Sequence, residues 1–136
     1  MTQPVPPPKI CLTKRICVTK RFTFSYAHCL INHPGKCANM HGHNAVLEVS
    51  LEGYPSCDTG MIIDFHDIKT FVSRLVIDKY DHQNLNSYFL HPTCENVAID
   101  IFDSIYKHLQ ANHGDIRLVK VRLSETEDSW VEVTNA

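Results

Sequence analysis

Residues 41–52 read HGHNAVLEVSLE, and apolar and polar side chains alternate along the second half of this stretch. Since successive side chains of a strand point to opposite faces, the alternation predicts a strand with one buried face that includes Leu47 and Leu51. His41 and His43 share the phase of that face. Two imidazoles at i and i+2 can bind one zinc ion, and two hydrogen-bonded polar residues at a strand start are the alternative.

A glycine, a lysine and a cysteine precede the histidine pair, at positions 35–37. Positively charged neighbours favour the thiolate, which is the form of cysteine that binds metals and acts as a nucleophile or base. From the residues alone, Cys37 is therefore either a further metal ligand or a reactive thiol beside the site.

A second alternating stretch lies upstream, where Phe22, Phe24 and Tyr26 alternate with smaller residues. This pattern predicts a strand that precedes the first one, with a turn at 32–35 between them. His28 continues the aromatic face, so its imidazole is expected at the end of the strand on the core side. By itself it is most simply a core-edge histidine.

Two helices are expected after the strand pair. Asp64 is a candidate N-cap for a helix that runs to about Lys79, and Thr93 is a candidate N-cap for a second helix that Gly114 ends. Their apolar positions recur at helical spacing and are expected to form core, not a cofactor site. These positions are Phe65, Ile68, Val72, Leu75, Val76, Val97, Ile101, Ile105 and Leu109.

The C-terminal part predicts two more strands. Val119, Val121 and Leu123 alternate with polar residues, and a turn at 127–129 leads to a strand near 130–133. The order β-β-α-α-β-β predicts an α+β fold in which a four-stranded antiparallel sheet carries both helices on one face. The open edges of such a sheet need protection, and pairing with other subunits into a closed barrel would provide it.

Composition sets further bounds. The length of 136 residues fits one domain, expected at 10–136 after a short proline-rich extended arm at 1–9. A net charge of −2 gives no global field for nucleic acid or a membrane surface. No apolar run approaches the ~18 residues that span a bilayer. The start of the chain lacks the basic and apolar regions of a signal peptide.

The six cysteines are scattered along the chain, which favours reduced thiols in a cytoplasmic protein. All except Cys37 are expected to be small buried or half-buried residues. They are Cys11, Cys17, Cys29, Cys57 and Cys94.

Two acidic positions could carry chemistry. Asp81 precedes His82 between the helices, and a carboxylate beside an imidazole suits acid–base work near neutral pH; a capping aspartate next to a surface histidine is the alternative. Glu125 continues the apolar phase of the preceding strand, where a carboxylate needs a partner. The guanidine-like edge of a pterin or guanine would donate two parallel N–H bonds to it, and solvent is the alternative.

Taken together, these segments resemble the 6-pyruvoyl-tetrahydropterin synthase / 6-carboxytetrahydropterin synthase family over residues 16–134. The shared segments are Phe24–His28, Gly35–Cys37, His41–His43, Gly60–Phe65, Asp81–Asn86, Pro92–Asn96 and Glu125–Thr126. The resemblance implies the tunnelling fold and a homo-oligomer, a trimer that closes a β-barrel or a dimer of such trimers. Active sites would then lie at subunit interfaces.

The resemblance also implies three groups of site residues and a Zn²⁺ cofactor. The implied zinc ligands are His28, His41 and His43. The implied catalytic proton-transfer residues are Cys37, Asp81 and His82. The implied pterin-binding residues are Glu125, with Thr93 and Glu95 near it.

The substrate that the resemblance implies is dihydroneopterin triphosphate. The short spacing between Cys37 and His41 is similar to that of the bacterial 6-carboxytetrahydropterin synthases of the queuosine pathway. This predicts a lyase that forms 6-carboxytetrahydropterin and releases acetaldehyde and triphosphate. A 6-pyruvoyl-tetrahydropterin synthase, which eliminates triphosphate, and a non-catalytic pterin- or zinc-binding relative are the alternatives. Cys29 and Ala45 depart from the family pattern, in which an arginine and an aromatic residue are usual.

A first cupin motif is another possible interpretation of Gly35, the histidine pair and Glu48. Glu48 falls on the opposite strand phase from His43, however, and two helices interrupt the strands. We therefore favour the pterin enzyme over a cupin.

Overall fold

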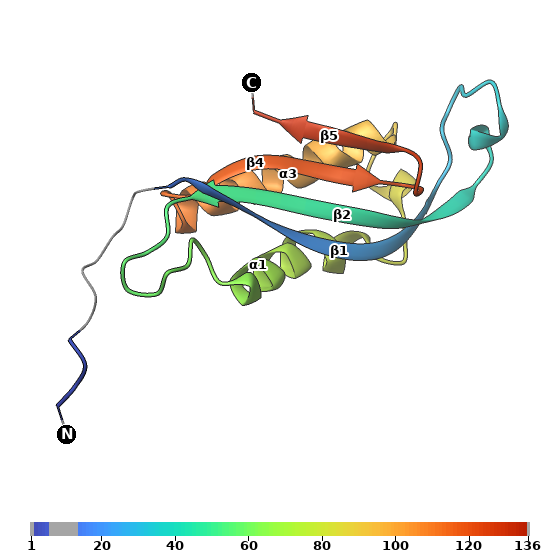
Figure 1. Cartoon of the computed structure of the whole chain (residues 1–136). Coiled ribbons are helices and arrows are strands. Elements are labelled where there is room, and N and C mark those ends of the chain that lie inside the picture. The colour runs from blue at the N-terminus through green and yellow to red at the C-terminus, as the bar shows by residue number, and fades with distance from the viewer. Residues whose placement is uncertain (1, 6–13, 136) are drawn as a thin grey trace.

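The computed structural model describes residues 2–5 and 14–135 (Figure 1). The strands are β1 (Ile16–His28), β2 (His41–Gly53), β3 (Gln83–Asn84), β4 (Arg117–Ser124) and β5 (Trp130–Thr134). The α-helices are α1 (Phe65–Val72), α2 (Asp78–Tyr80) and α3 (Cys94–Asn112). The α+β class is thus confirmed. Part of the predicted arm at 1–9 lies outside the described residues, and the division into arm and domain stays a prediction.

The five strands form one sheet in the order β3-β1-β2-β4-β5. β1 and β2 pair antiparallel along their whole length, and Figure 1 shows them as one long twisted ribbon. The two-residue strand β3 pairs parallel to β1, so the sheet is mixed. The prediction of a four-stranded antiparallel sheet is therefore wrong, because it did not include this parallel edge strand. Its sequence, Gln83-Asn84, has no alternation that could announce a strand.

One face of the sheet carries the core, and both long helices pack on it. The aromatic residues Phe22, Phe24 and Tyr26 of β1 are buried there with the apolar face of β2 and the inner residues of α1 and α3. This arrangement confirms the two helices on one face, and it confirms the phase that places His28 on the core side. His28 is 1% exposed.

Both predicted N-caps are present. The Asp64 carboxylate accepts a hydrogen bond from the backbone N–H of His66 at 2.8 Å, and the Thr93 hydroxyl accepts one from Asn96 at 3.2 Å. Phe65 is wrong as a core residue, because it lies at the first helical position and faces solvent. α1 continues through a π-helical turn at 73–77 into α2.

The end of α3 agrees with prediction, because the helix ends at Asn112 with His113 as its C-cap, directly before Gly114. One strand phase differs. In β4 the pairing with β2 shifts: Leu51 pairs with Leu118, and Ser50 pairs with Lys120, so Val119 is the extra residue of a bulge. Leu118 is consequently the buried residue and Val119 is half-buried. Beyond the bulge the predicted phase holds, and it carries the chain to Glu125 on the inner face.

The thiols do not all match the expectation. Cys17, Cys29, Cys37 and Cys94 are free, whereas Cys57 is disulfide-bonded, so the expectation of reduced thiols is wrong for Cys57. Cys17 and Cys57 are also exposed instead of buried. Cys11 lies outside the described residues. In the part of the chain that the structure describes, no helix is long and apolar enough to cross a membrane.

Candidate functional site

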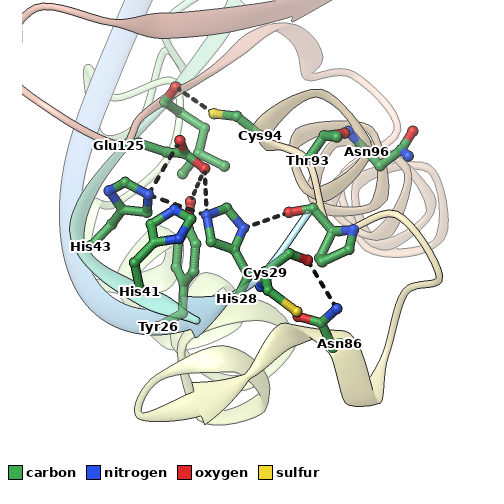
Figure 2. A network of polar contacts seen from close by, with 12 residues as sticks. Tyr26, His28, Cys29, His41, His43, Asn86, Thr93, Cys94, Asn96 and Glu125 are labelled. Carbon is green, nitrogen blue, oxygen red and sulfur yellow. Dashed lines mark hydrogen bonds and ion pairs between the residues drawn. The ribbon is translucent and has the colours of Figure 1, made fainter. Parts of the chain in front are cut away.

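The pairing of β1 with β2 brings three histidines together at one end of the ribbon (Figure 2). The register places His28 opposite His41, and His43 lies two residues further along the same face, opposite Tyr26. One side-chain nitrogen from each of these histidines lies within 4.8 Å of the other two. A single ion can therefore be reached by all three imidazoles.

Backbone carbonyls fix two of these rings. Nδ1 of His28 lies 2.7 Å from the carbonyl oxygen of Pro92, and Nδ1 of His41 lies 2.8 Å from that of Asn39. A carbonyl oxygen only accepts, so Nδ1 carries the proton in both rings and Nε2 is left as a ligand atom. Nε2 of His28 lies 3.1 Å from Nε2 of His43. Three neutral imidazoles form the donor set of catalytic zinc sites, which leaves one coordination position open.

The burial of the cluster also suits a metal. His28 is buried, and His41 and His43 are half-buried, so one side of the cluster is accessible from outside. Burial lowers the pKa of His43, and the two other imidazoles act in the same direction, while Glu125 opposes them. The balance favours the neutral ring, which is the form that coordinates metals.

Glu125, just beyond the end of β4, lies against the histidine cluster (Figure 2). Its Oε1 accepts a hydrogen bond of 2.7 Å from the Tyr26 hydroxyl. Its carboxylate oxygens lie 3.7 Å from Nε2 of His28 and 3.5 Å from Nε2 of His43. Burial raises the pKa of Tyr26 well above its usual value, and Glu125 adds to this, so the phenol stays protonated as the donor.

Cys94 is a neutral, structural thiol beside this carboxylate. Burial, with a smaller contribution from Glu125, raises its pKa to about 12. Its Sγ–H donates to the carbonyl oxygen of Leu123 at 3.4 Å. The half-buried position expected for this cysteine is confirmed.

Cys37 lies in a 3₁₀ turn (Lys36–Ala38) within the loop that joins β1 to β2. Figure 1 shows this loop projecting beyond the end of the ribbon. The backbone N–H of Leu30 donates to the carbonyl oxygen of Cys37 at 2.8 Å, which ties the turn to the segment that follows His28. The thiol is free and half-buried, at the same end of the ribbon as the histidine cluster.

Asp81 and His82 lie next to β3, on the side of β1 that faces away from β2. The Asp81 carboxylate accepts a hydrogen bond from the backbone N–H of Ser25 at 2.9 Å and lies 3.0 Å from Nδ1 of His82. The bond from Ser25 is the main reason why the pKa of Asp81 is lowered. His82 has a φ of 60°, a value that residues with side chains rarely adopt.

His82 of this dipeptide lines a cleft of about 390 Å³ together with Ser25, Asn44 and His43 of the histidine cluster. Among residues 14–135, no hydrogen bond or ion pair joins Asp81 or His82 to the three histidines. The structure therefore joins the histidines and Glu125 through short polar contacts, whereas the acidic dipeptide shares only the lining of this cleft with His43.

Residues 17–136 match the family model described as 6-pyruvoyl tetrahydropterin synthase. The chain belongs to this family. A putative 6-carboxy-5,6,7,8-tetrahydropterin synthase of Archaeoglobus fulgidus is 38% identical over 111 residues, which cover 82% of this chain and 89% of that protein. A 6-pyruvoyl tetrahydrobiopterin synthase of Dictyostelium discoideum is 33% identical over 135 residues, covering 88% and 96%.

The fold agrees with this assignment. The solved structure of Caenorhabditis elegans 6-pyruvoyl tetrahydropterin synthase superposes with a TM-score of 0.79 at 29% identity, and the match covers 90% of this chain and 97% of that one. The chain is thus an enzyme of the 6-pyruvoyl tetrahydropterin synthase family, a lyase that eliminates triphosphate from a pterin triphosphate. Relatives of the carboxy and the pyruvoyl type both match, so family membership leaves the product open.

Two further residues carried over from the family pattern lie at the start of α3. Thr93 is half-buried, and Figure 2 shows it beside Cys94, although its hydroxyl accepts the capping bond from Asn96. Glu95 is exposed in the first turn of the helix and makes no hydrogen bond or ion pair with another described residue. Thr93 directly follows Pro92, whose carbonyl oxygen contacts Nδ1 of His28.

Some groups that shape the site have no functional signal in the sequence. Tyr26 was expected only as a buried aromatic residue, yet its hydroxyl holds Glu125. The carbonyl oxygens of Pro92 and Asn39 orient two histidines, and a backbone carbonyl has no residue type that could announce it. Only the tertiary structure identifies these three groups.

Proposed function

We propose that this enzyme is a zinc-dependent 6-carboxytetrahydropterin synthase of the queuosine pathway. Dihydroneopterin triphosphate and water would give 6-carboxytetrahydropterin, acetaldehyde and triphosphate. The observation that carries the proposal is the cluster of three histidine nitrogens within 4.8 Å of one another, with Glu125 against it. The short spacing between Cys37 and His41 favours the carboxy product over the pyruvoyl product.

In this proposal His28, His41 and His43 hold Zn²⁺. The carbonyl contacts at Nδ1 of His28 and His41 support this role, because they leave Nε2 unprotonated. When bound, zinc acts as a Lewis acid that increases the acidity of substrate hydroxyls. Glu125 anchors the substrate, because a carboxylate can accept two parallel N–H bonds from the guanidine-like edge of the pterin ring. Thr93 and Glu95 flank that ring.

Cys37 is proposed as the base that removes a proton from the substrate side chain, and the Asp81–His82 pair as the group that handles a second proton. A proton can move only over hydrogen-bond distance, and among the described residues the pair makes no hydrogen bond or ion pair with the histidine cluster of its own chain. We therefore propose that a second copy of the chain supplies Asp81 and His82, in a trimer or a dimer of trimers that closes a barrel. The proposed location is the cytoplasm, with no nucleic-acid or membrane partner.

The test combines Cys37→Ala with an assay on dihydroneopterin triphosphate in which mass spectrometry identifies the products. Turnover should fall by about 10²–10⁴-fold, the usual contribution of a general base, while the zinc content is retained. Cys17→Ala is the matched control, because Cys17 is also a free thiol but lies near the opposite end of β1.

Loss of zinc in Cys37→Ala would make this thiol a ligand and refute its role as a base. A 6-pyruvoyl product from the unaltered enzyme would establish the alternative synthase. No product at all, with zinc bound, would favour a non-catalytic pterin-binding relative.

A further inference from the structure

Among the described residues, Tyr26 is the side chain that donates a hydrogen bond to the Glu125 carboxylate. We infer that Tyr26 is a positioning residue, which fixes the orientation of Glu125 for ligands that present a guanidine-like edge. The inference rests on the proposed function, because it assigns a further residue to the pterin anchor.

The Tyr26 ring is held rigidly. It is 3% exposed. Its centroid lies 5.3 Å from that of His28 and 5.8 Å from that of His43, in edge-on and tilted contacts, and 5.7 Å from that of Phe24. Two side-chain torsions place a tyrosine hydroxyl, and this packing fixes both of them. The hydroxyl is therefore a fixed donor.

Glu125, in contrast, is restrained by the Tyr26 bond and by two longer contacts with the imidazoles of His28 and His43. It follows the last residue of β4, so no strand pairing fixes it, and its side chain is 21% exposed. A glutamate has three side-chain torsions, and burying or ordering it costs rotamer entropy. The 2.7 Å bond from Tyr26 selects one orientation of the carboxylate before a ligand arrives. Such preorganisation increases affinity, because the ligand does not bear the cost of ordering the group.

The bond also leaves the acceptors that a ligand needs. An ionised carboxylate has about four lone-pair positions on its two oxygens. Tyr26 occupies one position on Oε1. The nearest imidazole nitrogens lie 3.5 Å from Oε2 and 3.7 Å from Oε1, beyond the usual length of an N–H···O bond, so Oε2 and the second position on Oε1 can still accept from a ligand. Two parallel N–H donors can therefore still bind one to each oxygen.

Ala45 is a small residue beside this arrangement on the sheet. It is completely buried on β2, and the register places it diagonally across from Tyr26, whose direct partner is His43. Diagonal neighbours on a sheet lie within reach of an aromatic side chain. A small residue at position 45 is thus compatible with a tyrosine at position 26.

Tyr26→Phe tests the inference, because it removes the hydroxyl and keeps the ring. Binding of 7,8-dihydroneopterin is compared with binding of the corresponding lumazine, in which a carbonyl oxygen replaces the ring amino group. Loss of a hydrogen bond to a charged group predicts that the dihydroneopterin Kd rises by about tenfold. The lumazine Kd should change by less than about twofold, since that ligand lacks the donor pair.

Tyr80→Phe is the matched control, because the buried Tyr80 also donates its hydroxyl to a carboxylate, that of Asp100, on the helices. It should leave both Kd values unchanged. In an E125Q background, Tyr26→Phe should change the dihydroneopterin Kd by less than about twofold, since Tyr26 acts through Glu125.

Equal losses for the two ligands, full additivity with E125Q, or an equal effect of Tyr80→Phe would each overturn the inference. Loss of zinc in Tyr26→Phe would also overturn it, because the phenol would then act on the histidines. If the unaltered enzyme bound no dihydroneopterin, the proposed function itself would fail, and this inference would fail with it.

Discussion

Replacing His28 and His41 by alanine, one at a time, separates metal binding from packing. His28 is 1% exposed, and its Nδ1–H is the donor to the Pro92 carbonyl, 64 residues away in sequence. His41 is half-buried, and its Nδ1–H bonds to Asn39, only two residues away. Each substitution removes one nitrogen from the cluster, but only the first also removes a long-range contact and a buried ring.

The expected magnitudes differ for this reason. Truncation of a buried ring to alanine costs about 3–5 kcal/mol, and an unpaired buried carbonyl costs about 1–3 kcal/mol with partial overlap between the two effects. In the metal-free protein we therefore expect His28→Ala to lower the free energy of unfolding by about 3–5 kcal/mol. His41→Ala should lower it by about 1 kcal/mol or less, because its bond is local and partly exposed.

Urea unfolding with and without a chelator, together with zinc analysis, measures both effects. Zinc at 100 times its Kd should stabilise the unaltered enzyme by about 2.7 kcal/mol, and both variants should lose this gain. His91→Ala is the control, because His91 is an exposed histidine next to Pro92 outside the cluster. The reasoning is refuted if metal-free His41→Ala is as unstable as His28→Ala, or if either variant keeps one equivalent of zinc.

Two further predictions concern the fold. Leu118→Ala should lower the free energy of unfolding by about 2–5 kcal/mol, since the bulge buries Leu118, whereas Val119→Ala should lower it by about 1 kcal/mol or less. Denaturant unfolding measures both values, and similar losses for the two variants would contradict the bulge. Burial, with Arg74 and His113 adding to it, holds the pKa of His108 below its ordinary value of 6.5. The unfolded chain then binds more protons, so this contribution to stability is complete above pH 6.5 and is lost as the pH falls toward the lowered pKa. His108→Phe should reduce the change of the free energy of unfolding with pH in that range. An unchanged pH dependence in unfolding experiments would refute this.

The sequence predicts the elements whose side-chain pattern runs without interruption. The strands β1 and β2 are thirteen residues long each, and the alternation over residues 22–26 and 47–51 sets the phase that determines which face His28, His41 and His43 share. A local pattern is sufficient here, because strand phase is a property of the chain itself. The antiparallel pairing then places His28 opposite His41, so the three histidines meet on one face at one end of the ribbon.

Features that depend on pairing between distant segments could not be predicted in this way. The bulge at Val119 exists because β4 must fit the register of β2, and nothing in its own alternation announces an extra residue. The strand at Gln83–Asn84 forms only because α2 delivers it to the edge of β1. The bond from Tyr26 to Glu125 joins residues 99 positions apart. Each of these features is a property of the assembled sheet.

The two proton-handling groups of the proposed reaction illustrate the same limit beyond one chain. Alternation along β1 turns Tyr26 to the inner face with the histidines and Ser25 away from it, and the backbone of Ser25 holds both Asp81 and His82. Within the described residues of one chain, the histidine cluster and Glu125 are joined by polar contacts that do not extend to the acidic dipeptide. Since protons move only over hydrogen-bond distance, our proposal places the edge of one subunit against the histidine cluster of a second. On this view the open edges of the sheet are part of the enzyme's active site.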